Sequence, residues 1–107
     1  MTMTTAAKSI LLVEDEPLVL QTTADLLEHD GYRVVGACNF REAVEALEAE
    51  PDLAVMVTDI SIGAGGDGVD LARLVAERFP KVRTVIVSGA LRPLGDAYPK
   101  DAIFFTK

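Results

Sequence analysis

The chain has 107 residues, of which 50% are hydrophobic and 25% are charged, as in a soluble globular domain with a single core. It has no apolar run long enough to span a membrane, and its N-terminal MTMTTAAK lacks the features of a secretory signal, so we expect a cytoplasmic protein. The net charge of −7 disfavours direct binding to nucleic acid, because nothing in the sequence resembles a basic stripe.

Short apolar runs rich in Val and Ile alternate along the chain with longer amphipathic stretches. The first pattern is typical of strands that are covered on both faces of a sheet. The expected strands are SILLVE (9–14), YRVVGA (32–37), LAVMVTD (53–59), VRTVIVS (82–88) and AIFFTK (102–107). The expected helices are 17–30, 39–50 and 68–79.

The boundaries of these helices carry recognisable start and stop residues. Pro17 lies in the first turn of the first helix, and Gly31 follows its end. Asn39 can cap the second helix, with Glu42 reaching back to complete a capping box. Pro80 ends the third helix.

Strands that alternate with helices predict an α/β fold, with a doubly wound parallel sheet covered by helices on both faces. Residues 1–107 are expected to form one domain. The connection 89–101 contains Pro93 and Pro99, so we expect only a short helix there and a mobile segment.

Polar residues stand at the ends of four of the expected strands. The first strand runs into Glu14, Asp15 and Glu16, and the third ends in Asp59. Parallel strands bring their carboxyl ends to one edge of the sheet, so Glu14, Asp15 and Asp59 should converge there. Like charges at short range repel, whereas Mg²⁺ would neutralise them and could bind phosphoryl oxygens at the same time.

Two further strand ends suit the same chemistry. The fourth strand ends in the hydroxyl of Ser88 and the fifth in the ammonium group of Lys107, which could hydrogen-bond and neutralise a phosphoryl group. One of the carboxylates could then attack phosphorus. Simpler interpretations are a helix cap for Asp15 or Glu16, a turn for Ser88 and a solvated terminus for Lys107.

The remaining titratable candidates have structural interpretations. His29, the single histidine, stands where a helical pattern ends, so we interpret it as a helix-terminus residue. Cys38 is the single cysteine and has no second ligand at metal spacing, so we interpret it as a small hydrophobe.

The segments LLVEDEP, VTDIS, GVDLA, VIVSG and FFTK resemble, in order and spacing, the landmarks of the receiver domain of two-component response regulators. The resemblance implies a flavodoxin-like strand order 2-1-3-4-5 and makes Asp59 the phosphoacceptor. It also implies functional roles for six other residues. The implied Mg²⁺ ligands are Glu14, Asp15, Asp59 and the backbone carbonyl of Ser61, and the phosphoryl-contacting and switch residues are Ser88, Lys107 and Phe104.

The implied function is that of a signalling domain that takes a phosphoryl group from a sensor histidine kinase and then changes its contact with a downstream target or effector domain. Such a domain catalyses only its own phosphorylation and dephosphorylation. One alternative is a receiver-like module that binds proteins without phosphorylation. Another is a magnesium-dependent phosphohydrolase, although Ser61 stands where those enzymes have a second Asp. Phe104 could also be a core aromatic beside Phe105.

Two departures from the family pattern affect these expectations. The glycine-rich SIGAGGDG (61–68) after Asp59 matches no nucleotide-binding motif, so we expect a flexible turn. The chain ends at Lys107, where the family continues into a fifth helix, so we expect a truncated domain with a bare apolar face. That face should promote self-association, including formation of a homodimer.

Overall fold

In a computed structural model of the chain, residues 8–63, 66–88 and 103–106 are described, with backbone alone for Ser88 and 104–106. Three helices and five strands alternate as the sequence predicts. They are β1 (Ser9–Val13), α1 (Pro17–His29), β2 (Arg33–Ala37), α2 (Phe40–Ala49), β3 (Leu53–Asp59), α3 (Gly68–Arg78), β4 (Arg83–Ser88) and β5 (Ile103–Thr106). The expectations for 1–7 and for the connection 89–101 fall outside the described residues.

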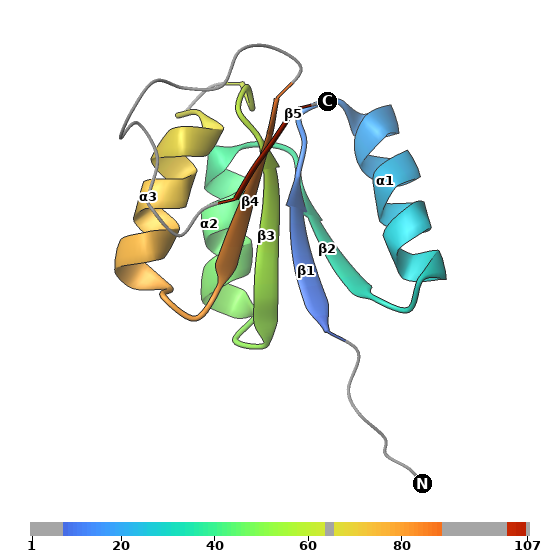
Figure 1. Ribbon diagram of the computed structural model, residues 1–107, viewed down its shortest axis with the longest axis horizontal. Coiled ribbons are helices and arrows are strands. Elements are labelled where there is room, and N and C mark those ends of the chain that lie inside the picture. Colours follow the sequence, from blue (N-terminus) through green and yellow to red (C-terminus); the bar gives the residue numbers. More distant parts are fainter. Residues whose placement is uncertain (1–7, 64–65, 89–102, 107) are drawn as a thin grey trace, which may run out of the picture.

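The five strands form one parallel sheet in the order β2-β1-β3-β4-β5 (Figure 1). The α/β fold and the strand order that the resemblance implies are therefore confirmed. The order in which successive strands are added to the sheet reverses at β1. The chain first adds β2 on one side of β1 and then β3 on the other. In sheets of this kind, the crevice at the carboxyl ends beside the reversal is where ligands bind.

The pairing register brings the ends of the central strands level with one another. Val13, the last residue of β1, pairs with Ala37 on β2 and with Thr58 on β3. Farther along the sheet, Asp59 pairs with Val87. The residues that follow β1 and those that end β3 and β4 therefore lie side by side at one edge.

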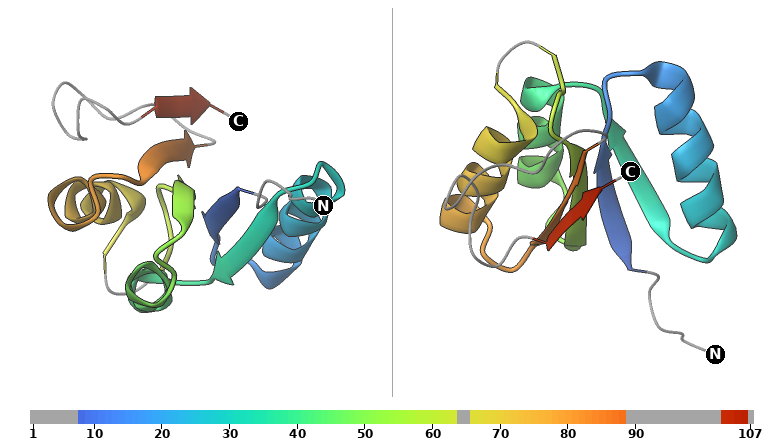
Figure 2. Two further views of the ribbon diagram at one scale, coloured as in Figure 1. Left: turned by 90° about the horizontal axis from the view of Figure 1, so that it is seen from below. Right: turned by 45° about the horizontal axis from the view of Figure 1, so that its top comes forward.

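The main core lies between the sheet and the pair α2 and α3, which cover the same face (Figure 2). Alternate residues of a strand point to opposite faces, and Leu11 and Val13 of β1 point into this core. Burial of these side chains away from water is the dominant stabilising term for such a layer. The fully buried members of large volume are Leu11, Val13, Met56, Ile62, Leu71 and Val75.

The opposite face is covered only in part, by α1. This helix packs against β1 and β2, and a Cβ atom added to Gly36 of β2 would lie 3.4 Å from the Leu20 side chain. No residue of α1 is buried, and Leu18 and Leu26 are 77% and 65% exposed. The helix therefore contributes little to the core and leaves apolar surface in contact with water.

The helix ends explain where these elements start and stop. Gly31, with φ of +98°, ends α1 in a backbone conformation that side chains disfavour, and its N–H donates to the Glu28 carbonyl at 3.0 Å. Asn39 caps α2 as predicted, because its Oδ1 accepts the Glu42 N–H at 2.8 Å. Within the described residues, no helix combines the length and apolar character needed to cross a membrane.

The predicted capping box at α2 is only half present. The Glu42 carboxylate accepts the N–H of Cys38 at 3.0 Å, one residue before the cap, instead of the N–H of Asn39. A complete capping box occurs at α3, where Asp67 Oδ1 accepts from Asp70 N–H at 2.9 Å and Asp70 Oδ2 accepts from Asp67 N–H at 3.1 Å. This box was not predicted from the sequence, because its first residue, Asp67, belongs to the glycine-rich segment 61–68.

The Asn39 cap gives a direct test of how α2 is held. Replacing Asn39 by Ala removes the acceptor for the Glu42 N–H, so we expect the free energy of unfolding to fall by about 1 kcal/mol. Urea denaturation followed by circular dichroism measures the change. The control Asn39→Ser retains a side-chain acceptor and should keep most of the stability, and equal losses in both variants would contradict the capping role.

Candidate functional site

Glu14 is the first residue after β1 and is held at the edge of the sheet. Its N–H donates to the Ala37 carbonyl at 3.0 Å, which extends the pairing with β2 by one residue. Its side chain is largely buried, with the residue only 8% exposed, and Oε2 accepts the N–H of Glu16 at 3.1 Å. A carboxylate at this depth has a fixed position before any ligand binds.

The two acids after Glu14 are exposed. Glu16 occupies the N-cap position of α1, but its side chain makes no capping hydrogen bond. The helix-cap interpretation is therefore wrong for the side chain of Glu16, which accepts no N–H of the first turn. Asp15 lies between them with its side chain at the surface.

Asp59 ends β3 on the strand that neighbours β1. Because Val13 pairs with Thr58, Glu14 and Asp59 follow the same register pair on adjacent strands. The backbone after Asp59 is held on two sides, since Ile60 N–H donates to the Val87 carbonyl at 3.1 Å and the Ile60 carbonyl accepts from Gly68 N–H at 2.7 Å. Asp59 is half-buried, so its carboxylate is fixed by the backbone yet reachable from solvent.

The residues after Asp59 form a packed loop. Ile62 is buried in the core, while Ser61 beside it is exposed. The anchored Ile62 fixes the path of the backbone at Ser61, the residue whose carbonyl is implied as a ligand. Gly66 and Gly68 lie close against other groups of the protein, whereas a Cβ atom on Gly63 would meet nothing within 4 Å, so the expected flexible turn stays a prediction.

The other implied site residues are placed only in part. The backbone of Ser88 ends β4 and pairs with Thr106 on β5, and Phe104 pairs with Ile86. Ser88 therefore lies at the same edge as Asp59, one residue beyond Val87. The side chains of Ser88 and Phe104 and the whole of Lys107 lie outside the described residues, so their predicted contacts stay predictions.

The carboxylates do not form a closed metal cage by themselves. Among the residues that the structure describes, no three His, Cys, Asp or Glu side chains are grouped so that they could hold a metal ion. The Glu14 carboxylate is engaged with the backbone of Glu16, and Asp15 is exposed. Mg²⁺ needs only one or two carboxylates, completed by water and phosphoryl oxygens, so the residues at this edge still fit that ion.

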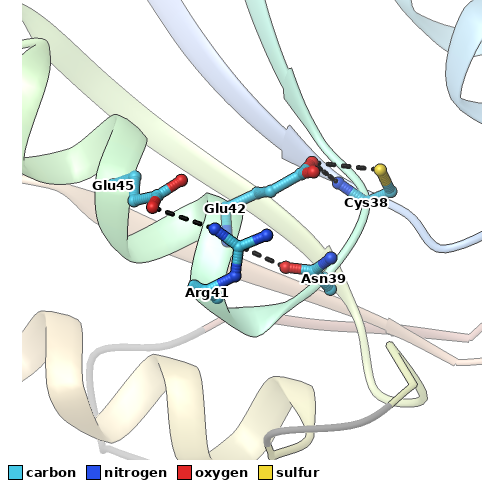
Figure 3. Close-up of polar contacts among 5 residues, drawn as sticks. All are labelled: Cys38, Asn39, Arg41, Glu42 and Glu45. Carbon is cyan, nitrogen blue, oxygen red and sulfur yellow. Dashed lines mark hydrogen bonds and ion pairs between the residues drawn. The ribbon is translucent and has the colours of Figure 1, made fainter.

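A contact that the sequence analysis missed lies beside this edge, at the end of β2. Cys38 directs both its N–H and its Sγ to Glu42 Oε1, each at 3.0 Å (Figure 3). The hydrogen bond to the Glu42 carboxylate raises the pKa of the Cys38 thiol, and burial and the negative charge add to the effect. The same bonds hold the pKa of Glu42 below its usual range. Cys38 is therefore a hydrogen-bond donor and is only partly buried, which corrects its interpretation as a small hydrophobe.

Comparison with known proteins gives one family. The family model described as the response regulator receiver domain matches residues 10–95. Among curated proteins, the transcriptional regulatory protein PdtaR of Mycobacterium tuberculosis is 37% identical over 73 residues, which are 66% of this chain and 34% of that protein. The two-component response regulator PprB of Pseudomonas aeruginosa is 33% identical over 55 residues, which are 51% of this chain and 20% of that protein. The chain thus spans a minority of the length of these relatives.

Solved structures agree with the family model. The response regulator receiver protein of Sinorhizobium medicae is 28% identical with a TM-score of 0.85, covering 94% of this chain and 82% of that one. The response regulator TrrA of Thermotoga maritima, solved in complex with Mg²⁺ and BeF, has a TM-score of 0.80 at 22% identity, covering 94% of this chain and 86% of that one. The second likeness concerns the fold alone.

The Cys38–Glu42 contact predicts slow alkylation of the thiol. Because the thiolate is the reactive form, Glu42→Gln should raise the alkylation rate of Cys38 at pH 8 several-fold, by returning the thiol pKa toward that of free cysteine. Reaction with iodoacetamide followed by intact mass, over a range of pH, measures the rate. The matched control is Glu45→Gln on the same helix, which loses only the exposed pair with Arg41.

The sign of the pH dependence follows from the same contact. A folded-state thiol pKa above the unfolded value stabilises the fold below the unfolded pKa, and this contribution is lost as the pH rises through the folded pKa.

In the alkylation experiment, identical profiles of rate against pH for the wild type and Glu42→Gln would show that the contact does not control the reactivity of the thiol.

Proposed function

The chain belongs to the response regulator receiver domain family, and we propose that it accepts a phosphoryl group on Asp59 from a sensor histidine kinase in a Mg²⁺-dependent reaction. The observation that carries the proposal is the placement of Asp59 at the end of β3, level in the register with the buried Glu14 that follows β1. Receiver domains are signalling domains of two-component systems and not enzymes in the usual sense. The catalysis we assign to this one is its own phosphorylation and dephosphorylation.

The transfer requires an oxygen nucleophile with a fixed position. An oxygen of the Asp59 carboxylate forms the new bond to phosphorus, the P–N bond of the donor phosphohistidine breaks, and the imidazole keeps the electron pair and gains a proton. The N–H and the carbonyl of Ile60 are both hydrogen-bonded, to Val87 and to Gly68, and these bonds hold the backbone next to Asp59 in place. Little conformational entropy therefore has to be lost when Asp59 reaches the reactive geometry. A position at a strand end also leaves the carboxylate open to an incoming donor.

We assign the metal ligands to the same edge. Glu14, Asp15, Asp59 and the backbone carbonyl of Ser61 would hold Mg²⁺, which when bound supplies positive charge against the carboxylates and the phosphoryl oxygens. Glu14 contributes a pre-positioned carboxylate, and the exposed Asp15 contributes one that can adjust. The TrrA structure contains Mg²⁺ with BeF, which supports this assignment by similarity of fold.

The output of the domain follows from the charge that phosphorylation adds. A phosphoryl group on Asp59 brings extra negative charge and acceptor oxygens, for which we propose Ser88 and Lys107 as partners and Phe104 as the aromatic that moves with them. A shift between two arrangements requires that the phosphoryl group stabilise one more than the other. We propose that the altered surface contacts a downstream protein or effector domain, in the cytoplasm.

Intact mass after incubation with acetyl phosphate and Mg²⁺ tests the proposal. We expect the wild type to gain one phosphoryl group, because Asp59 is the nucleophile, and we expect no gain in Asp59→Asn or in the presence of a chelator. The matched control is Asp52→Asn, an exposed carboxylate in the turn before β3, which should gain the group like the wild type.

A wild type that binds Mg²⁺ but gains no phosphoryl group would contradict the phosphoacceptor role of Asp59. The result would favour a receiver-like module that binds its partner without phosphorylation. Modification that persists in Asp59→Asn would instead move the acceptor to another side chain.

We also propose that the chain self-associates through the face that carries α1. Leu18, Val19 and Leu26 of this helix are exposed, and no residue of α1 is buried. Copies of net charge −7 repel one another, so association should strengthen as salt screens the charge.

Light scattering over a range of concentration and ionic strength tests this surface. We expect the mean mass to rise with both in the wild type and to stay near that of a monomer in Leu18→Gln/Leu26→Gln, which removes apolar area. A control substitution of exposed Ala49 to Gln on α2, which leaves the net charge unchanged, should behave like the wild type. A wild type that is monomeric throughout would contradict self-association.

A further inference from the structure

Gly68, the first residue of α3, lies directly against the backbone of Asp59. It is buried, and a Cβ atom built on it would overlap the Asp59 carbonyl oxygen. The same atom would lie 3.0 Å from the Asp59 carbonyl carbon and 3.0 Å from Ile60 Cα. All three neighbours are backbone atoms, which cannot turn away as the end of a flexible side chain can.

The close approach is held in place by hydrogen bonds. Gly68 N–H donates to the Ile60 carbonyl at 2.7 Å, so the start of α3 is bonded to the residue after Asp59. The capping box of Asp67 and Asp70 fixes the first turn of the same helix. The turn that contains Gly68 is thus attached both to its own helix and to the end of β3.

A second glycine holds the loop from the other side. Gly66 has φ of +138°, and a Cβ atom on it would lie 2.9 Å from Cδ2 of Phe40, the first residue of α2. The loop between β3 and α3 therefore lies close against the start of α2 at Gly66 and against the end of β3 at Gly68. Neither contact leaves room for a methyl group without movement.

We propose that Gly68 is a positioning residue for phosphoryl transfer, acting through the peptide of Asp59. This inference rests on the function proposed above. The absence of a side chain lets α3 approach until its first turn sets the position of the Asp59–Ile60 peptide. That peptide in turn fixes where the Asp59 carboxylate meets phosphorus and where the chain turns toward Ser61. A displacement of about 1 Å can cost about 100-fold in the rate of a positioned reaction.

Gly68→Ala tests the proposal, because alanine is otherwise the better residue for a helix. We expect the rate constant at saturating acetyl phosphate and Mg²⁺, followed by intact mass, to fall about 10- to 100-fold. The acetyl phosphate concentration that gives half the maximal rate should change little, since the substitution alters the placement of the nucleophile and adds nothing that the donor contacts.

Two control variants separate positioning from general damage. Gly36→Ala places a Cβ 3.4 Å from the flexible Leu20 side chain and should react like the wild type. Val75→Ala opens space in the core against α3 and lowers stability without adding an atom near Asp59. All variants are assayed at a temperature where circular dichroism shows them folded.

The outcomes are distinct. A slow Gly68→Ala beside a normal Val75→Ala supports the positioning role. Wild-type rates in Gly68→Ala, equal slowing in Val75→Ala, or a Gly68→Ala chain that does not fold under any assay condition would each overturn it. A wild type that gains no phosphoryl group would overturn the proposed function itself, and the role of Gly68 with it.

Discussion

The parallel pairing of β1 with β3 is the constraint on which the rest of the site depends, because it sets acidic residues side by side at the ends of the two strands. Parallel pairing of Val13 with Thr58 obliges Glu14 and Asp59 to follow the same register pair. Burial of Glu14 lowers the local dielectric and so strengthens its interaction with any charge nearby. The sheet therefore places two acidic residues at one edge, where a bound cation would offset their charge.

Much of this fold follows from local patterns in the sequence. The Val- and Ile-rich runs became strands within one residue of their expected limits, and Pro17 and Gly31 delimit α1 as their backbone preferences require. The placement of Glu14 and Asp59 at one edge could be predicted too, because parallel strands have a common direction. The strands and helix ends depend on residues close together in the chain, whereas the meeting of Glu14 and Asp59 follows from the predicted parallel sheet.

The features that escaped prediction depend on approach between distant segments. Glu42 has the right spacing for a capping box, yet its carboxylate meets Cys38, whose position is set by the end of β2. The glycines at 66 and 68 resemble a flexible turn in sequence. In the structure, Gly66 lies close against the Phe40 side chain, and Gly68 lies close against the backbone of Asp59. A sequence identifies a glycine but not the atom that would collide with its missing side chain.

The shallow seating of α1 has a consequence for how stability is distributed. Because no residue of α1 is buried, we expect this helix to open at a lower free-energy cost than α2 or α3, so its amide protons should exchange through local opening. The Glu14–Glu16 contact stands at the start of that helix. A ligand that binds only when those acids are in their ordered positions would stabilise the ordered helix. Part of its binding free energy would therefore raise the free-energy cost of opening α1.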